Sequence, residues 1–101
     1  MAITVELQDE QGITIATLDD PWGSVDDIVA SVEADASSAH LRCIDPYGDT
    51  VFNRLQVPLL IEELRRVPAW KANTKLRDEL VRFAQRVVDD GPHLYLKFIG
   101  D

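Results

Sequence analysis

The stretch ITVELQDEQGITIATL, residues 3–18, decides the fold class, because it contains two alternating runs around one short polar loop. The first run places apolar side chains on one side of the chain: Ile3, Val5 and Leu7. The second run does the same with Ile13 and Ile15. Two such runs joined by a loop that ends in glycine are typical of a β-hairpin. We therefore expect two antiparallel strands whose apolar sides face the core.

The next segment predicts a helix that begins at Ser24. Serine is a preferred N-cap residue, and apolar residues follow it at helical spacing: Val25, Ile28, Val29 and Val32. All four are β-branched, and β-branched residues have low intrinsic helix propensity, so we expect packing to stabilise this helix.

The middle of the chain predicts a second hairpin. Residues 39–45 alternate, which places Leu41 and Cys43 opposite His40, Arg42 and Ile44. The sequence DPYG, residues 45–48, has the composition of a type I turn, in which we expect Gly48 to adopt a positive φ. Residues 50–52 then suit a short returning strand.

The C-terminal half predicts two amphipathic helices and a last strand. One helix runs from Pro58 to about Val67, and the other begins near Asn73 or Thr74 and ends at the Gly91-Pro92 pair. Their apolar stripes contain Leu60, Ile61 and Leu64, and Leu76, Leu80, Phe83, Ala84 and Val87. Residues 93–99 form the strand, with Leu94, Leu96 and Phe98 on one face.

These elements predict one α+β domain over residues 1–101. Its architecture is a single antiparallel sheet of about five strands with three helices on one face, in the order ββαββααβ. A chain of 101 residues suits a single domain.

The charge of the chain is uneven. Residues 1–41 hold nine acidic residues and no Lys or Arg, whereas residues 42–101 hold the other nine acids and all ten bases. Nucleic-acid binding needs clustered bases, so we expect neither a nucleic-acid partner nor an anionic membrane. A basic protein would be attracted, although solubility alone also explains such a charge.

Targeting signals and cysteine usage favour the cytoplasm. The chain has no apolar run of the roughly 20 residues that a membrane-spanning helix needs. The residues after Met1 do not resemble a signal peptide. One cysteine, Cys43, cannot form an internal disulfide.

The run DPYGDTVFN, residues 45–53, is the densest cluster of chemically distinctive residues. It could bring together two carboxylates, a phenol and an amide: Asp45, Asp49, Tyr47 and Asn53. It lacks the acid spacing of a calcium loop, and nothing in it separates two carboxyl pKa values for acid–base catalysis. It is either a structural turn or a recognition loop in which Tyr47 makes the contact.

Other combinations predict no metal, cofactor or catalytic set. His40 and Cys43 would point to opposite faces of a strand, and Cys43 would share the buried face with Leu41 as an inert thiol. His40 and His93 lack further residues to complete a zinc site. No glycine-rich phosphate loop is present in the sequence.

The solvent-facing side of the sheet is the second candidate surface. We expect it to contain apolar residues that could form an interface, namely Ala16, Leu18, Ile44, Tyr95 and Ile99. Beside them would lie four polar residues, Glu6, His40, Arg42 and Lys97. Trp22 and Trp70 lie in loops, where we expect them to cap the core.

Two segments carry a resemblance to known sequences. The run DPYGDTVFN at 45–53 and the ending FIGD at 98–101 resemble a group of small bacterial proteins without an assigned role. The resemblance covers the middle hairpin and the last strand, and it implies no activity and no binding residue.

The sequence therefore predicts a non-enzymatic protein-interaction module, comparable to an immunity protein or an inhibitor that binds a basic partner. Asp26 and Asp27, on the solvent side of the first helix, would contribute to that contact. One alternative is a small-molecule or enzymatic site near residues 45–53. The other is a homodimer through the solvent-facing side of the sheet, where Ile44, Tyr95 and Ile99 would meet.

Overall fold

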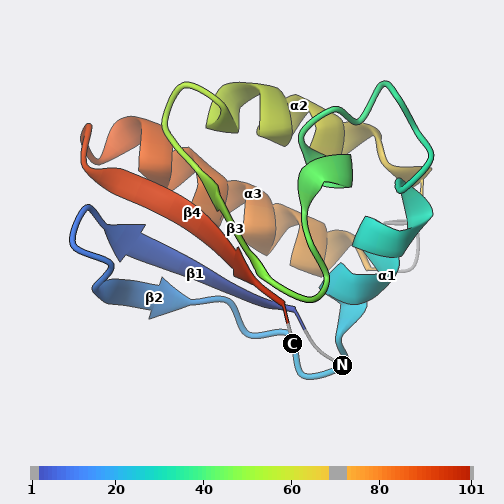
Figure 1. Cartoon of the computed structure of the whole chain (residues 1–101), viewed down its shortest axis with the longest axis horizontal. Helices are drawn as coiled ribbons and strands as arrows, with labels where there is room; N and C mark the ends of the chain where they lie inside the picture. Colours follow the sequence, from blue (N-terminus) through green and yellow to red (C-terminus); the bar gives the residue numbers. More distant parts are fainter. Residues whose placement is uncertain (1–2, 69–72, 101) are drawn as a thin grey trace.

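A computed structural model of the chain describes residues 3–68 and 73–100. Its elements are β1 (Thr4–Asp9), β2 (Thr14–Thr17), α1 (Ser24–Ser31), the 3₁₀ helix η1 (Leu41–Cys43), β3 (Asp49–Phe52), α2 (Val57–Arg66), α3 (Thr74–Asp89) and β4 (Leu94–Ile99). Figure 1 shows their arrangement. The α+β class, the single antiparallel sheet and the three helices are confirmed. Within the described residues the sheet has four strands rather than about five, in the order ββαβααβ.

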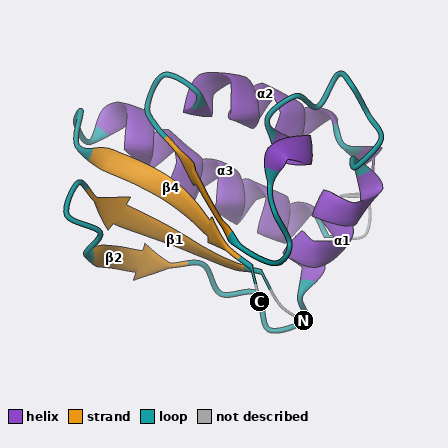
Figure 2. Cartoon of the chain, in the orientation of Figure 1, coloured by secondary structure: helices purple, strands orange, loops and turns teal. Residues whose placement is uncertain are grey.

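The sheet has the spatial order β2-β1-β4-β3, so that the last strand of the chain lies in its centre. Opposite residues of neighbouring strands share a face. One such row is buried or half-buried and consists of Phe52, Leu96, Leu7 and Ala16. The row on the other face consists of Val51, Lys97, Glu6 and Thr17. Figure 2 shows the helices on one side of the sheet, and their buried side chains form one core with Phe52, Leu96 and Leu7.

Strand β2 faces the core with residues other than those predicted. Gln8 lies opposite Thr14, but the next pair is Leu7 with Ala16, so Ile15 is an extra residue in a β-bulge. An extra residue reverses which side chains face the core. Ala16 therefore packs against the core and Leu18 is buried, whereas Ile13 and Ile15 are 58% and 47% exposed. The prediction that Ile13 and Ile15 face the core, with Ala16 and Leu18 on the solvent side, was wrong.

The strand predicted at residues 39–45 is also wrong. This segment forms turns and η1, and β3 pairs with β4 instead of with a strand at 39–45. Leu41 and Ile44 are both buried, at 1% and 3% exposure, although strand alternation would place them on opposite faces. Ile44, which we expected on the solvent-facing side of the sheet, is therefore part of the core.

The helices begin near the predicted residues, but α1 is capped differently. The carboxylate of Asp20 accepts the backbone N–H groups of Ser24 and Val25, each at 2.9 Å, while Ser24 makes no capping bond. In α3 the side chain of Asn73 caps the helix by accepting the N–H of Leu76 at 3.2 Å. None of the helices in the described part of the chain is long and apolar enough to cross a membrane.

The two segments that carry the sequence resemblance lie against each other. The N–H of Gly100 donates to the carbonyl of Gly48 at 2.7 Å. A Cβ atom at Gly100 would lie 2.5 Å from the carbonyl carbon of Pro46, so only glycine fits this approach. Gly48 does not have the positive φ that we expected; a Cβ there would instead lie 2.8 Å from the Asp45 carboxylate.

Candidate functional site

A groove of about 470 Å³ lies between α1 and the turn at residues 45–48. Four of the residues that the sequence singled out line it: Asp26, Asp27, Ile44 and Tyr47. The fold thus brings the predicted acidic pair and the predicted recognition loop to one place, although they are about twenty positions apart in the sequence.

The wall formed by α1 and the following turn carries three carboxylates, which belong to Asp26, Asp27 and Glu33. Asp27 and Glu33 are exposed. Asp26 is half-buried, and its Oδ1 accepts the backbone N–H of Ile3 at 2.8 Å. Asp26 therefore attaches the start of β1 to α1. We had expected it on the solvent side of the helix, and this was only partly right. Asp27 and Glu33 are the acids most available to a partner.

The opposite wall is the turn at residues 45–48, which side-chain bonds hold in shape. The Asp45 carboxylate accepts the N–H of Tyr47 at 2.9 Å, and the Thr50 hydroxyl accepts the N–H of Asp45 at 2.9 Å. These local bonds are those of a turn initiated by aspartate. They place Tyr47 on the outside of the turn, where it is 71% exposed.

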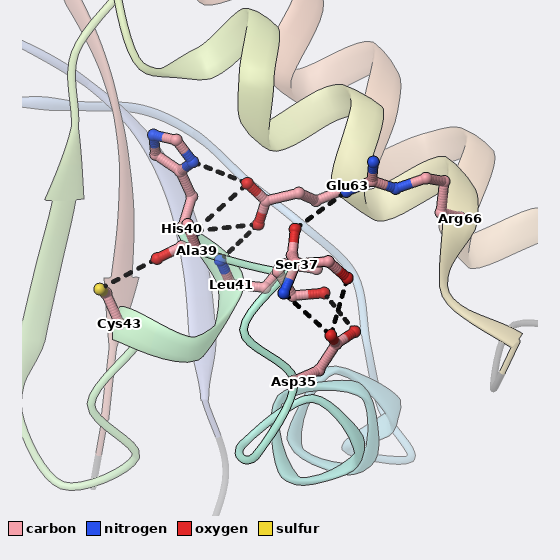
Figure 3. Close-up of polar contacts among 9 residues, drawn as sticks. Asp35, Ser37, Ala39, His40, Leu41, Cys43, Glu63 and Arg66 are labelled. Carbon is pink, nitrogen blue, oxygen red and sulfur yellow. Dashed lines mark hydrogen bonds and ion pairs between the residues drawn. The ribbon is translucent and has the colours of Figure 1, made fainter.

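The chain leading to this turn is held by one buried carboxylate, Glu63 of α2, which is 5% exposed. It accepts the backbone N–H groups of His40 and Leu41, each at 2.9 Å, and His40 Nδ1 lies 2.7 Å from its Oε2. Figure 3 shows these bonds converging on the carboxylate. Bonds between a carboxylate and N–H groups are strong, and together they offset the cost of burying the charge.

Arg66, the last residue of α2, adds a second connection to the same segment. Its Nη2 donates to the carbonyl of Ser37 at 3.0 Å. Nearby, the Asp35 carboxylate accepts the hydroxyl and the N–H of Ser37 and the hydroxyl of Ser38 (Figure 3). These hydrogen bonds, with a smaller contribution from Arg66, hold the pKa of Asp35 below its usual value. A cavity of about 530 Å³ lies beside them, but its polar groups are largely bonded to one another.

The remaining candidates of residues 45–53 do not converge on one place. Asp49 forms an ion pair with Lys97 of β4 at 3.4 Å. Asn53 lies at the other end of β3, where its side chain accepts the N–H groups of Leu55 and Gln56 and so precedes α2. Only Asp45 and Tyr47 remain near the groove. The geometry therefore does not assemble the four side chains into a single site.

The solvent-facing side of the sheet contains fewer of the predicted residues than the sequence indicated. Tyr95 and Ile99 lie there, opposite Gln8 and Thr4 of β1, and both are half-buried. His40 and Arg42 lie outside the sheet because their segment forms no strand, and Ala16 and Leu18 turn to the core. The surface therefore retains two of the five predicted apolar residues, and Val51, at 51% exposure, lies on it as well.

Cys43 and Trp22 differ from their predicted environments. Cys43 is exposed rather than buried, and its thiol donates to the carbonyl of Ala39 at 3.1 Å, away from His40 (Figure 3). Trp22 is 88% exposed and does not cap the core. Trp70 lies outside the described residues. Among residues 3–68 and 73–100, no three His, Cys, Asp or Glu side chains are placed to hold a metal ion.

Glu63 is the residue that sequence reasoning missed. It follows Glu62, which is exposed. The helical period distinguishes the two, since Glu63 lies three residues after Leu60 and four before Val67, at the edge of the apolar stripe, whereas Glu62 lies on the opposite side of the helix. The bonds of Glu63 to residues 40 and 41 depend on the folded chain.

Comparison with protein-family models, with curated proteins and with solved structures finds no match to this chain.

Proposed function

We propose that this chain is a non-enzymatic protein-interaction module that binds a basic protein, in the manner of an immunity protein or an inhibitor. The observation that carries the proposal is the acidic segment, residues 19–35, which contains six carboxylates and no base: Asp19, Asp20, Asp26, Asp27, Glu33 and Asp35. Within the described residues none of these six carboxylates forms an ion pair. Their negative potential is therefore available to a partner.

Two exposed aromatic side chains accompany the acidic segment and support the same conclusion. Trp22 lies within the segment at 88% exposure, and Tyr47 faces it across the groove at 71% exposure. Tryptophan and tyrosine dominate the binding energy of many protein interfaces, since they bury a large area with few rotatable bonds. A protein that leaves both exposed beside unpaired acids has the composition of a contact surface.

The cytoplasm is the compartment that we assign to this module. Its one cysteine, Cys43, is a free and exposed thiol. Reducing compartments preserve such thiols, whereas oxidising ones favour disulfides.

The proposal is tested by the salt dependence of association with a partner captured from the native host. Charge steering accelerates association, and ions screen it over about 10 Å at 0.1 M salt. We expect the on-rate to fall by about tenfold or more between low and high salt. The double variant Asp27→Lys/Glu33→Lys should lower the low-salt on-rate by a similar factor. Both residues are exposed, and in the described structure neither carboxylate forms a hydrogen bond or an ion pair that the substitution would break.

The matched control is Glu62→Lys/Asp89→Lys, which changes the net charge equally on exposed positions of α2 and α3. It should retain most of the wild-type on-rate. If both double variants slow association equally, the effect belongs to net charge and not to the acidic segment. Captured partners that are all acidic, or rates indifferent to salt, would overturn the proposal.

A further inference from the structure

The groove between α1 and the 45–48 turn combines an apolar floor with a charged rim. The floor includes Ile3, Val29 and Ile44, and Ala30 and Pro46 lie beside them. The rim carries the carboxylates of Asp27 and Glu33. A volume of about 470 Å³ lies within the range of pockets that bind ligands.

The net charge of the residues that line the groove determines whether a cationic or an anionic ligand is favoured. Asp26, Asp27 and Glu33 contribute three carboxylates, whereas Arg42 contributes one guanidinium, which leaves a net formal charge of −2. The described structure shows no ion pair for any of these four side chains. A cationic ligand is therefore favoured and an anionic one is repelled.

Arginine matches both features of the groove at once. Its methylene stem can lie on an apolar floor while its charged head reaches the acids at the rim. The planar guanidinium also stacks on aromatic rings better than the ammonium of lysine does, and Tyr47 presents an exposed ring at the edge of the groove. The floor left between two such stems accommodates an aliphatic side chain.

We propose that this groove docks a short segment of the partner protein in which an aliphatic residue is flanked by arginines. The inference rests on the proposed function, because it assigns the contact site and the chemistry of that same basic partner.

Synthetic peptides test the chemistry without the natural partner. The probe is a fluorescent peptide with the repeat Arg-Leu-Arg-Val-Arg, whose binding is followed by anisotropy. Replacing its aliphatic residues by serine should weaken binding by about tenfold, which corresponds to about 1.4 kcal/mol. Replacing arginine by lysine should weaken it less. Equal binding of the serine peptide, or no binding of the arginine peptide, overturns the proposal.

Variants of the protein test the location. Ala30 is exposed and lines the groove. Ala30→Tyr should therefore fill the groove and weaken binding of the arginine peptide by about tenfold. Ala34→Tyr is the matched control, since Ala34 is exposed but does not line the groove. Tyr47→Ala should abolish the preference for arginine over lysine. The assignment of the peptide to this groove is overturned if Ala30→Tyr binds the peptide as tightly as the wild type does and if the amide NMR shifts that the peptide causes lie away from residues 29–33 and 44–47.

The two proposals can fail separately. If Asp27→Lys/Glu33→Lys slows association with the captured partner but Ala30→Tyr does not, the acidic module stands and the groove is rejected as its contact site. If Ala30→Tyr blocks the peptide while partner association ignores salt and charge reversal, the groove binds arginine-rich segments and the proposed function is rejected. Circular dichroism of each variant verifies that the fold is retained.

Discussion

Residues 73–100 and residues 32–48 both contain periodic patterns of polar and apolar residues, but only the first region folds as its pattern predicts. In the first region, α3 and β4 form where the periodicity places them, and Leu80, Leu96 and Phe98 are buried as expected. In the second region, alternation predicts a strand, and the chain forms turns and η1 instead. The difference is that α3 forms its own backbone bonds and β4 bonds to a strand on each side, whereas the N–H groups of His40 and Leu41 bond to a side chain of α2.

The largest expected effect is in the first region. Leu80 is 1% exposed in the middle of α3, so Leu80→Ala should lower the free energy of unfolding by about 3–5 kcal/mol through lost burial and a residual cavity. Phe83, on the same predicted stripe, is only half-buried, so Phe83→Ala should have a smaller effect. Urea unfolding measures both. A larger loss for Phe83→Ala would mean that the helix face is rotated from the one described.

The second-largest expected loss of stability is in residues 32–48, whose structure the periodicity of the sequence does not explain. Glu63→Ala leaves the N–H groups of His40 and Leu41 without their acceptor, and each unsatisfied buried group costs about 1–3 kcal/mol. We expect a total loss of about 2–4 kcal/mol by urea unfolding. Glu62→Ala, one position earlier and exposed, should change stability by less than about 0.5 kcal/mol. Equal effects at both positions would show that Glu63 does not hold the 38–44 segment.

A smaller effect is expected where the two regions meet. Gly100→Ala would place a Cβ atom 2.5 Å from the carbonyl carbon of Pro46, so backbone must move and unfolding free energy should fall by about 1–2 kcal/mol. Gly48→Ala meets the Asp45 side chain instead, which can rotate, so its effect should be smaller. Thermal unfolding compares the two. If Gly100→Ala is neutral, the C-terminal residues do not pack on the turn as described.

The smallest effect concerns an exposed carboxylate. Ser37→Ala removes a hydroxyl that bonds to Asp35, so the pKa of Asp35 should rise toward its usual value, which NMR titration measures. Because the folded pKa of Asp35 is lowered, its bonds stabilise the fold above the unfolded pKa of about 4. That contribution is lost as the pH falls through the folded pKa. Ser31→Ala is the control, since its hydroxyl donates to the carbonyl of Ile28. An unchanged Asp35 titration in Ser37→Ala would contradict the assignment.

The candidate site shows the same division between local and tertiary information. Asp27 and Tyr47 were identifiable from the sequence because an acidic helix face and a turn signature are local patterns. Their meeting across one groove was not, since it depends on the path of residues 32–44 between them. Part of that path is fixed by the bonds of Glu63 to His40 and Leu41, which lie more than twenty positions before it in the chain.

The sequence by itself determined the α+β class, the three helices, the four strands, the pairing of β1 with β2, and the acidity of residues 1–41. These features rest on periods of two and 3.6 residues and on turn residues, which act within a few positions. The tertiary structure alone decided the bulge at Ile15, the loss of a strand at 39–45 and the burial of Ile44. Each depends on hydrogen bonds or packing between residues far apart in the chain, and such contacts override local preference when they satisfy buried backbone groups.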